Sequence, residues 1–191
     1  MIQEQITITE ITGVGPYNQV EFTSANGDST SVVLEYAGTS STNLHTVYLD
    51  GADYITFSHM TLKASGTSYG RIVLMDGGAS NNSFLNNVFD MPQSTSSYIA
   101  AIYSSGDIDD SLKVINNHII NGGYGLYIRG AGSTTRERGV HIENNYIDGA
   151  AYYAAYFYYQ DSLQFLNNVV REGSNSTYFY GLYFGYIFDN F

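Results

Sequence analysis

Two aspartates and an arginine are the residues whose types and spacing come nearest to a catalytic group. Asp50, Asp76 and Arg129 each end a short apolar stretch, and we expect these stretches to be equivalent strands of a repeat. In adjacent strands the two carboxylates would lie about 5 Å apart, as in a retaining glycosidase. The same pair suits Ca²⁺. Two observations favour a plain turn instead: a glycine follows each aspartate, and no Lys or Arg column stands nearby to neutralise a uronate.

A second acidic group lies in the loop that follows Gly106. Asp107, Asp109 and Asp110 form the densest cluster of carboxylates in the sequence, and carboxylate oxygens are the usual ligands of Ca²⁺. Their spacing differs from that of an EF-hand loop, and a solvated turn is the alternative. The four histidines lack zinc-ligand spacing. We therefore expect no cofactor other than Ca²⁺.

Tyrosine is the third kind of residue that points to binding. The chain has 19 tyrosines and no tryptophan, and tyrosine recurs at one position of the short apolar stretches, with Leu74 as the exception. An exposed aromatic ring offers a sugar both an apolar face and a hydroxyl. Cross-strand aromatic contacts on a sheet surface, or a protein–protein contact, would explain the same pattern. The candidate ligand-binding residues are Tyr48, Tyr103, Tyr127, Tyr156, Tyr158 and Tyr183.

A repeat must position these residues. One motif, an apolar residue followed by two mostly polar ones, Asn, any residue and an apolar residue, reads Phe84-Leu85-Asn86-Asn87-Val88-Phe89. Its copies start at positions 57, 84, 114, 142, 165 and 187, so successive copies are 22 to 30 residues apart. A short strand, such as Val47–Gly51, recurs with about the same period. Two interleaved motifs with one period indicate a solenoid.

The strands that this repeat contains are short and alternate apolar with polar residues, with no sustained helical period. We predict an all-β fold, a right-handed parallel β-helix of about 6–7 coils with 22–30 residues each. Residues 47–191 should form the regular coils and residues 1–46 less regular first coils, all in a single domain, 1–191. Both ends resemble cuts through a repeating structure, which favours a fragment of a longer chain or copies that stack end to end.

The second asparagine of each motif has a structural explanation. Stacked one per coil, the amides can hydrogen-bond along the solenoid axis and to turn backbone groups. Met60 takes this position in one copy. Alternate strand residues, including Leu182 and Phe184, should point inward to the core. The predicted ladder comprises Asn87, Asn117, Asn145, Asn168 and Asn190.

These motifs resemble those of a known family. The asparagine motif resembles the parallel β-helix repeat of the pectin-lyase-like superfamily. Glu4–Gly13 and Val20–Asp28 look like β-helix regions of large secreted surface proteins of Bacteroidetes-type bacteria. The resemblance implies an extracellular or cell-surface location. It is specific for fold and weak for function, because the superfamily holds lyases, hydrolases and adhesins.

Composition removes several classes of function. A net charge of −11, with only seven Lys and Arg, argues against a nucleic-acid partner, which needs clustered basic residues. The same charge disfavours docking on anionic lipid. No apolar stretch reaches the roughly 18 residues of a membrane span, so we expect no membrane insertion. Without cysteine there are no disulfides and no thiol chemistry.

We therefore expect a non-enzymatic extracellular module, structural or adhesive, that binds polysaccharide or another cell-surface partner through its tyrosines. A carbohydrate-active enzyme, a polysaccharide lyase or glycoside hydrolase, is the second hypothesis, with Asp50, Asp76 and Arg129 as its outer-face residues. The third is a segment that stacks end to end into a filament.

Overall fold

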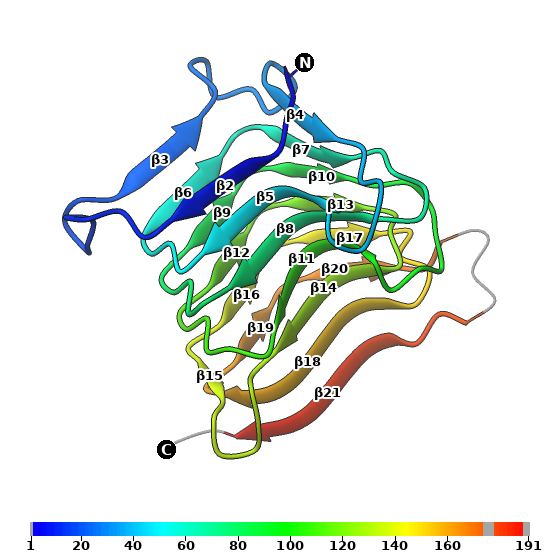
Figure 1. Cartoon of the computed structure of the whole chain (residues 1–191). Helices are drawn as coiled ribbons and strands as arrows, with labels where there is room; N and C mark the ends of the chain where they lie inside the picture. Colours follow the sequence, from blue (N-terminus) through cyan, green and yellow to red (C-terminus); the bar gives the residue numbers. More distant parts are fainter. Residues whose placement is uncertain (1, 174–177, 189–191) are drawn as a thin grey trace.

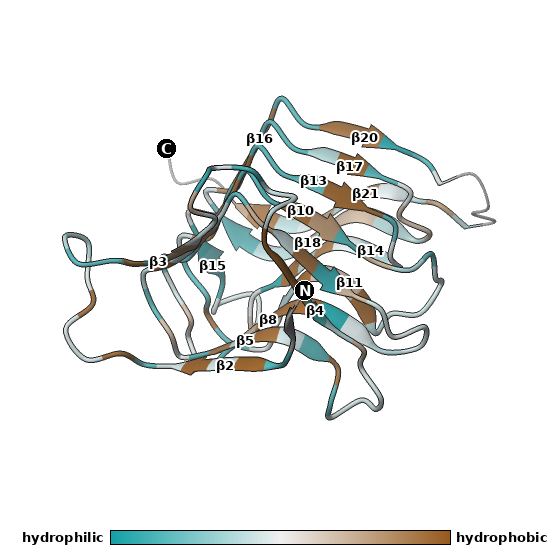
Figure 2. Ribbon diagram, turned by 90° about the horizontal axis from the view of Figure 1, so that it is seen from above, coloured by the Kyte–Doolittle hydropathy of each residue, from teal (hydrophilic) through white to brown (hydrophobic). Residues whose placement is uncertain are grey.

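The computed structural model describes residues 2–173 and 178–188, and these residues wind into a parallel β-solenoid (Figure 1). Every pairing between named strands is parallel, and the described residues contain no helix. We call the three sheets I, II and III, in the order in which each coil visits them. The strands carry most of the apolar residues and the connections are mostly polar (Figure 2).

Sheet I contains the longest strands, and sheets II and III contain short ones. Sheet I consists of β2 (Ile6–Thr9), β5 (His45–Asp50), β8 (Gly70–Asp76), β11 (Ile99–Ser105), β14 (Tyr124–Arg129), β15 (Glu137–Arg138), β18 (Tyr153–Asp161) and β21 (Gly181–Phe188). Sheet II consists of β3 (Val20–Thr23), β6 (Ile55–Ser58), β9 (Ser83–Leu85), β12 (Lys113–Ile115), β16 (His141–Glu143) and β19 (Gln164–Leu166). Sheet III consists of β1 (Ile2–Gln3), β4 (Val33–Tyr36), β7 (Thr61–Ala64), β10 (Val88–Asp90), β13 (His118–Ile120), β17 (Tyr146–Asp148) and β20 (Val169–Arg171).

The strands from β5 to β20 make five regular coils with a strand in every sheet, and the fourth coil adds the short β15 to sheet I. Before them, β2, β3 and β4 form a wider coil, opened by the loops 10–19 and 24–32, and β21 follows as the last strand of sheet I. The prediction of a parallel β-helix is confirmed. The predicted count of six to seven coils is slightly too high, because it includes the irregular first coil and the isolated last strand.

The core is a column of stacked apolar side chains inside the three sheets. Phe22, Phe57 and Phe84 lie on successive strands of sheet II, with ring centroids 4.9 and 5.8 Å apart. Parallel pairing puts each inward residue over its equivalent, so like side chains pack on like. A single coil has no second layer against which to bury this face, so the core forms only by stacking.

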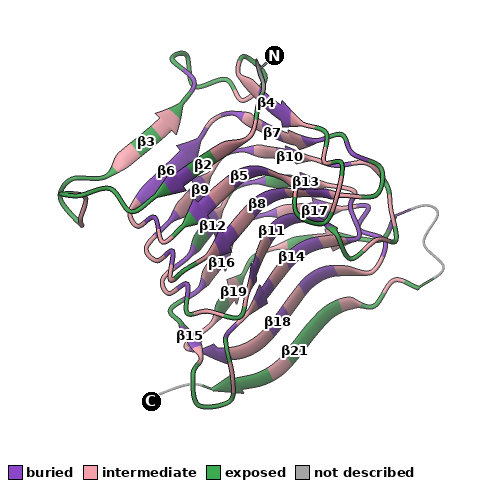
Figure 3. Cartoon of the chain, in the orientation of Figure 1, coloured by how far each residue is buried: buried purple, intermediate pink, exposed green. Residues whose placement is uncertain are grey.

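The expectation that Leu182 and Phe184 lie in the core is wrong. Both point to the core side of β21, but their side chains are 39% and 46% exposed. In the described residues, β21 has a partner strand, β18, on one side only, and it is exposed along most of its length (Figure 3). No further coil of the described chain covers these side chains. The expected end-to-end stacking stays a prediction.

The turn from sheet II to sheet III explains why the motif contains two asparagines. The first, represented by Asn86, Asn116, Asn144 and Asn167, has φ between 54° and 58°. Asparagine tolerates this left-handed conformation better than most residues, because its short side chain relieves the steric cost. His59 takes the same place in the earlier coil, with φ of 51°. The sequence pattern alone left this residue without a role.

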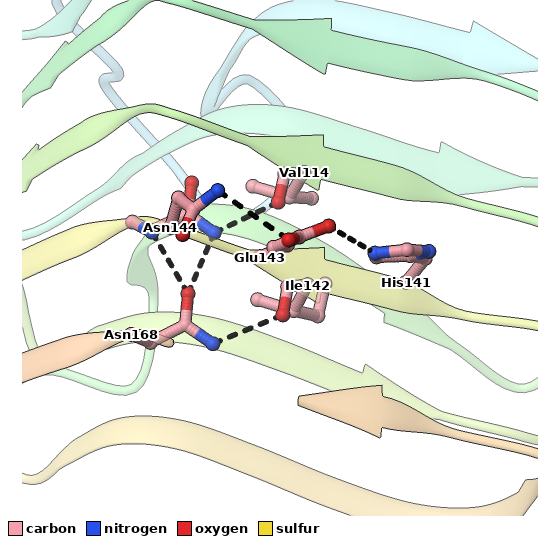
Figure 4. Close-up of polar contacts among 7 residues, drawn as sticks. Val114, His141, Ile142, Glu143, Asn144 and Asn168 are labelled. Atoms are coloured by element: carbon pink, nitrogen blue, oxygen red, sulfur yellow. Dashed lines mark hydrogen bonds and ion pairs between the residues drawn. The ribbon is translucent and has the colours of Figure 1, made fainter. Parts of the chain in front are cut away.

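The second asparagine ties neighbouring coils together. Asn117 Oδ1 accepts a hydrogen bond of 2.8 Å from the backbone N–H of Asn87, and its Nδ2 donates to the Phe84 carbonyl at 2.8 Å. Asn168 repeats this arrangement toward Asn145 and Ile142 (Figure 4). The ladder is confirmed from Asn87 to Asn168, and Met60 donates its backbone N–H to Asn87 Oδ1 at 3.2 Å. Asn190 lies outside the described residues.

Replacing Asn117 by alanine should destabilise the protein strongly. The side chain is buried and satisfies two backbone groups of the preceding coil, which would lose their partners. Each unsatisfied buried group costs about 1–3 kcal/mol, so we expect a loss of roughly 2–4 kcal/mol. The measurement is the urea midpoint followed by circular dichroism.

The control is Asn18→Ala, which removes an exposed asparagine side chain from the loop 10–19 and should change the free energy of unfolding by less than about 0.5 kcal/mol. Equal losses in the two variants would contradict a specific role for the ladder.

Candidate functional site

The outer face of sheet I carries the candidate residues in three columns parallel to the solenoid axis. The first column holds His45, Arg71, Ala100, Tyr124 and Tyr153. The second holds Tyr48, Leu74, Tyr103, Tyr127, Tyr156 and Tyr183. The third holds Asp50, Asp76, Ser105, Arg129 and Tyr158. The charged residues concentrate near β5 and β8, and the tyrosines toward β18 and β21.

Four of the six predicted tyrosines form one continuous stack. Tyr103, Tyr127, Tyr156 and Tyr183 lie on consecutive strands, with ring centroids 4.7 Å apart and planes within 5–7° of parallel. Tyr158 joins from the third column, 6.1 Å from Tyr156. Tyr48 stands apart, because Leu74 interrupts the column between it and Tyr103.

This stacking changes what the tyrosines offer to a ligand. A sugar that stacks on an aromatic residue needs a free ring face, but the neighbouring tyrosines cover the ring faces inside the stack. On Tyr103, the guanidinium carbon of Arg71 lies 3.3 Å from the ring centroid. Ring edges and hydroxyl groups, one per coil, therefore remain for a ligand, and we call these hydroxyls the hydroxyl row. Side-chain hydrogen bonds already join those of Tyr103 and Tyr127 to Arg71 and Arg129.

The tyrosine surface is wider than the sequence indicated. Tyr124 and Tyr153, in the first column, are 5.7 Å apart and nearly parallel, and each touches the main stack edge-on. Burial, with further contributions from neighbouring tyrosines, raises the pKa of Tyr124 and of Tyr156 to about 12, so both stay neutral at physiological pH. Ring contacts connect Tyr103, Tyr124, Tyr127, Tyr152, Tyr153, Tyr156, Tyr158, Tyr159, Tyr180, Tyr183 and Tyr186.

The predicted carboxylate pair has a third member that sequence reasoning placed elsewhere. Asp50 and Asp76 are partners on adjacent strands. The N–H of Gly77 donates to Asp76 Oδ1 at 3.0 Å and to Asp107 Oδ2 at 2.9 Å, so Asp107 belongs to the same cluster. Burial raises the pKa of Asp76, helped by its hydrogen bond with Asp107 and by the charges of Asp107 and Asp50.

Arg129 does not join this cluster. Ser105 separates it from Asp76 in the third column, and its guanidinium lies 5.9 Å from the ring centroid of Tyr158 and 5.8 Å from that of Tyr159. A lyase or hydrolase needs acid, base and cation to converge on one reacting atom. The three residues that the sequence suggested for catalysis are thus divided between an acidic cluster and an aromatic surface.

The three aspartates considered for Ca²⁺ have different partners. Asp107 turns to Gly77, Asp110 Oδ1 accepts from the N–H of Arg138 at 2.6 Å, and Asp109 is buried. Among the described residues no group of three or more His, Cys, Asp or Glu side chains is arranged to hold a metal ion.

Asp109 belongs instead to a buried polar network. The Ser104 hydroxyl oxygen lies 2.7 Å from Asp109 Oδ2 and 2.5 Å from Glu137 Oε1, and Gln160 Nε2 donates to Glu137 Oε2 at 2.8 Å. All four side chains are buried. The sequence pattern marked only Asp109, as a candidate Ca²⁺ ligand, since Ser104 occupies a core position and Glu137 follows an irregular loop.

This network must hold a proton. The Ser104 hydroxyl has one hydrogen to donate, so it cannot donate to both carboxylates. Burial raises the pKa of Glu137 to about 8 and that of Asp109 to about 6, so Glu137 is the group that keeps the proton at neutral pH. Glu137 then donates to Ser104, and Ser104 donates to the ionised Asp109.

Searches of protein-family models, curated proteins and solved structures with this chain returned no match. No helix long and apolar enough to cross a membrane occurs among the residues that the structure describes.

The stability of the protein should fall as the pH rises from about 4.5 to about 8. In that window the folded protein keeps a proton on Glu137 that the unfolded chain releases, so folding binds protons and a higher pH opposes it. We expect Glu137→Gln, whose amide also donates to Ser104, to flatten this dependence. At pH 8 it should raise stability by at least about 1 kcal/mol, or roughly 2–4 °C in melting temperature.

Thermal melts at half-unit pH steps provide the measurement. Glu10→Gln, in the exposed loop 10–19, is the matched control and should leave the slope unchanged. An unaltered slope in Glu137→Gln would show that another group titrates.

Proposed function

We propose that this chain is a non-enzymatic structural and adhesive module of the cell surface or extracellular space, and that it binds polysaccharide through the outer face of sheet I. The observation that carries the proposal is the continuous tyrosine surface on that face. We also infer membership of the pectin-lyase-like superfamily, on the strength of the asparagine motif and its ladder.

The tyrosine surface has the properties of a contact surface. Tyrosine supplies a large, rigid area at low entropic cost, and large exposed aromatic areas on soluble proteins usually mark interaction sites. The stack fixes each ring further, because its neighbours restrict its rotation. Arg71 and Arg129 lie among the rings, and these contacts hold their guanidinium groups in place.

The chemistry of this face favours a polyol over an apolar partner. Tyrosine hydroxyls both donate and accept hydrogen bonds, as sugar hydroxyls do. They recur at the spacing of the coils, so a polymer laid along the solenoid axis meets the same group several times. Repeated weak contacts of this kind add up along a chain.

The alternative of a carbohydrate-active enzyme has less support. Its acids and its cation lie apart, and the Asp50–Asp76–Asp107 cluster has an evident role in closing turns through Gly77. Release of reducing ends or of unsaturated uronates from a polysaccharide, lost in Asp50→Asn and Asp76→Asn, would replace the adhesive proposal with this one.

Removing the hydroxyl row should weaken polysaccharide binding while leaving the fold intact. The triple variant Tyr103→Phe, Tyr127→Phe and Tyr156→Phe keeps the rings stacked and deletes three outward hydroxyls. We expect at least a tenfold loss of affinity, since each lost hydrogen bond costs about 0.5–1.5 kcal/mol. Affinity electrophoresis against a panel of neutral and uronate-containing polysaccharides provides the measurement.

Tyr146→Phe, on the outer face of sheet III, is the matched control and should bind like the parent chain. If no polysaccharide of the panel retards the parent chain, or if the triple variant binds as well as the parent, the proposed role of this face is wrong.

A further inference from the structure

A groove separate from the tyrosine surface runs along the solenoid where sheet I turns into sheet II. Its volume is about 480 Å³. The lining begins at Pro16 and Gln19, before β3, and reaches Gln164, on β19, so it crosses six successive coils. Five coil spacings of about 4.8 Å make this groove roughly 24 Å long. It is therefore narrow, shallow and elongated.

The local backbone builds one wall of the groove. At the turn before each of the sheet II strands β6, β9, β12, β16 and β19, one residue adopts positive φ, between 57° and 65°. These residues are Tyr54, Asn81, Ser111, Gly139 and Ser162. All five line the groove. The N–H of Asn81 donates to the Asp110 carbonyl and that of Ser111 to the Arg138 carbonyl, so this turn is locked to the next coil at each level.

The outward residues at the start of the sheet II strands form the other wall. Ser83, Lys113, His141 and Gln164 are consecutive partners on β9, β12, β16 and β19. The loop 10–19 contributes Pro16 and Gln19 at one end. Because register fixes both walls, the groove presents a polar group from each wall at nearly every coil.

The lining is polar, with few charges. Hydroxyls and amides come from serine, asparagine and glutamine side chains, and none of the lining residues is acidic, although the chain has 18 Asp and Glu. Lys113 is exposed and has no ion pair among the described residues. The Oε2 atom of Glu143 lies 2.8 Å from Nε2 of the lining residue His141 (Figure 4), and Glu143 itself is not among the lining residues.

We propose that this groove is a second binding site, which takes a single linear glycan chain with few or no negative charges. Its length suits several sugar units in a row. Its hydroxyls and amides donate and accept hydrogen bonds as a polyol requires. A densely anionic chain would meet one cation, Lys113, on a protein of net charge −11.

A peptide fits this groove less well. An extended peptide gains most of its affinity by pairing with a free sheet edge. The strands of sheet II that line the groove are paired on both sides from β6 to β16, so their backbone groups are already used. Most lining residues are also polar, and only Pro16 and Tyr54 offer large apolar side-chain surfaces to those of a peptide.

The test is a titration of the whole chain with hexasaccharides of linear glucans, xylans and mannans, and with a galacturonate hexamer, by calorimetry. We expect one of the neutral hexamers to bind, and to bind more tightly than the galacturonate. Ser83→Phe fills the groove at its middle and should lower that affinity at least tenfold. Leu85→Phe, two residues along the same strand and outside the lining, should change it by less than twofold.

A second variant shows whether a loss of affinity could come from misfolding. Gln164→Ala removes one lining amide from an exposed position and should lower the affinity severalfold with an unchanged melting temperature. Binding of none of the hexamers, equal losses in Ser83→Phe and Leu85→Phe, or tighter binding of the galacturonate would overturn the proposal.

The tyrosine surface and the groove can be told apart. The triple phenylalanine variant of sheet I should bind the hexamer with parent affinity, and Ser83→Phe should keep the polysaccharide retention attributed to the tyrosines. A hexamer lost in the phenylalanine variant and kept in Ser83→Phe would assign the glycan to sheet I alone.

Discussion

Parallel hydrogen bonding between equivalent backbone positions is the interaction on which the rest of this structure depends. Each coil has too little apolar surface to fold alone, and it gains stability only when the next coil lies on it in register. The asparagine ladder secures that register at the sharpest turn. It binds both a donor and an acceptor of the neighbouring coil, as Asn117 does with Asn87 and Phe84. A slip by one residue would break those bonds and turn the core phenylalanines outward.

Pairing in register also has a disadvantage, because it places residues of the same kind over one another in adjacent coils. For Phe57 on Phe84, or Tyr127 on Tyr156, the result is favourable packing. For the carboxylates of Asp50 and Asp76 the result is repulsion. Loop residues bring further carboxylates close, and the chain limits that repulsion in two ways. The N–H of Gly77 bridges Asp76 and Asp107 at the surface, and a retained proton on Glu137 relieves the buried pair with Asp109.

The fold could be predicted because its determinants are local and repeated. The Asn-Asn motif recurs at each turn, and its spacing alone indicates the solenoid and most of the core. The features that the sequence did not predict belong to single coils. The loop before Glu137 and the uncovered β21 each occur once, so no repeated pattern predicts them. The glycines that follow β5 and β8 have positive φ. In later coils Tyr159 and Tyr186 occupy the equivalent position and take the same left-handed conformation.

The position of the tyrosine surface could be predicted from the sequence, but only part of its chemistry. Knowing that tyrosines share a column does not tell whether their ring faces point outward, and at the coil spacing they stack on each other instead. The sequence did not predict the groove, because serines and glutamines are ordinary surface residues until the register of the strands aligns them. Both surfaces therefore offer polar groups at one period, set by the backbone. A ligand whose own repeat matches that period can bond to coil after coil, whereas one with a different repeat falls out of step. Selectivity for a linear polymer would thus follow from the same stacking that holds the fold together.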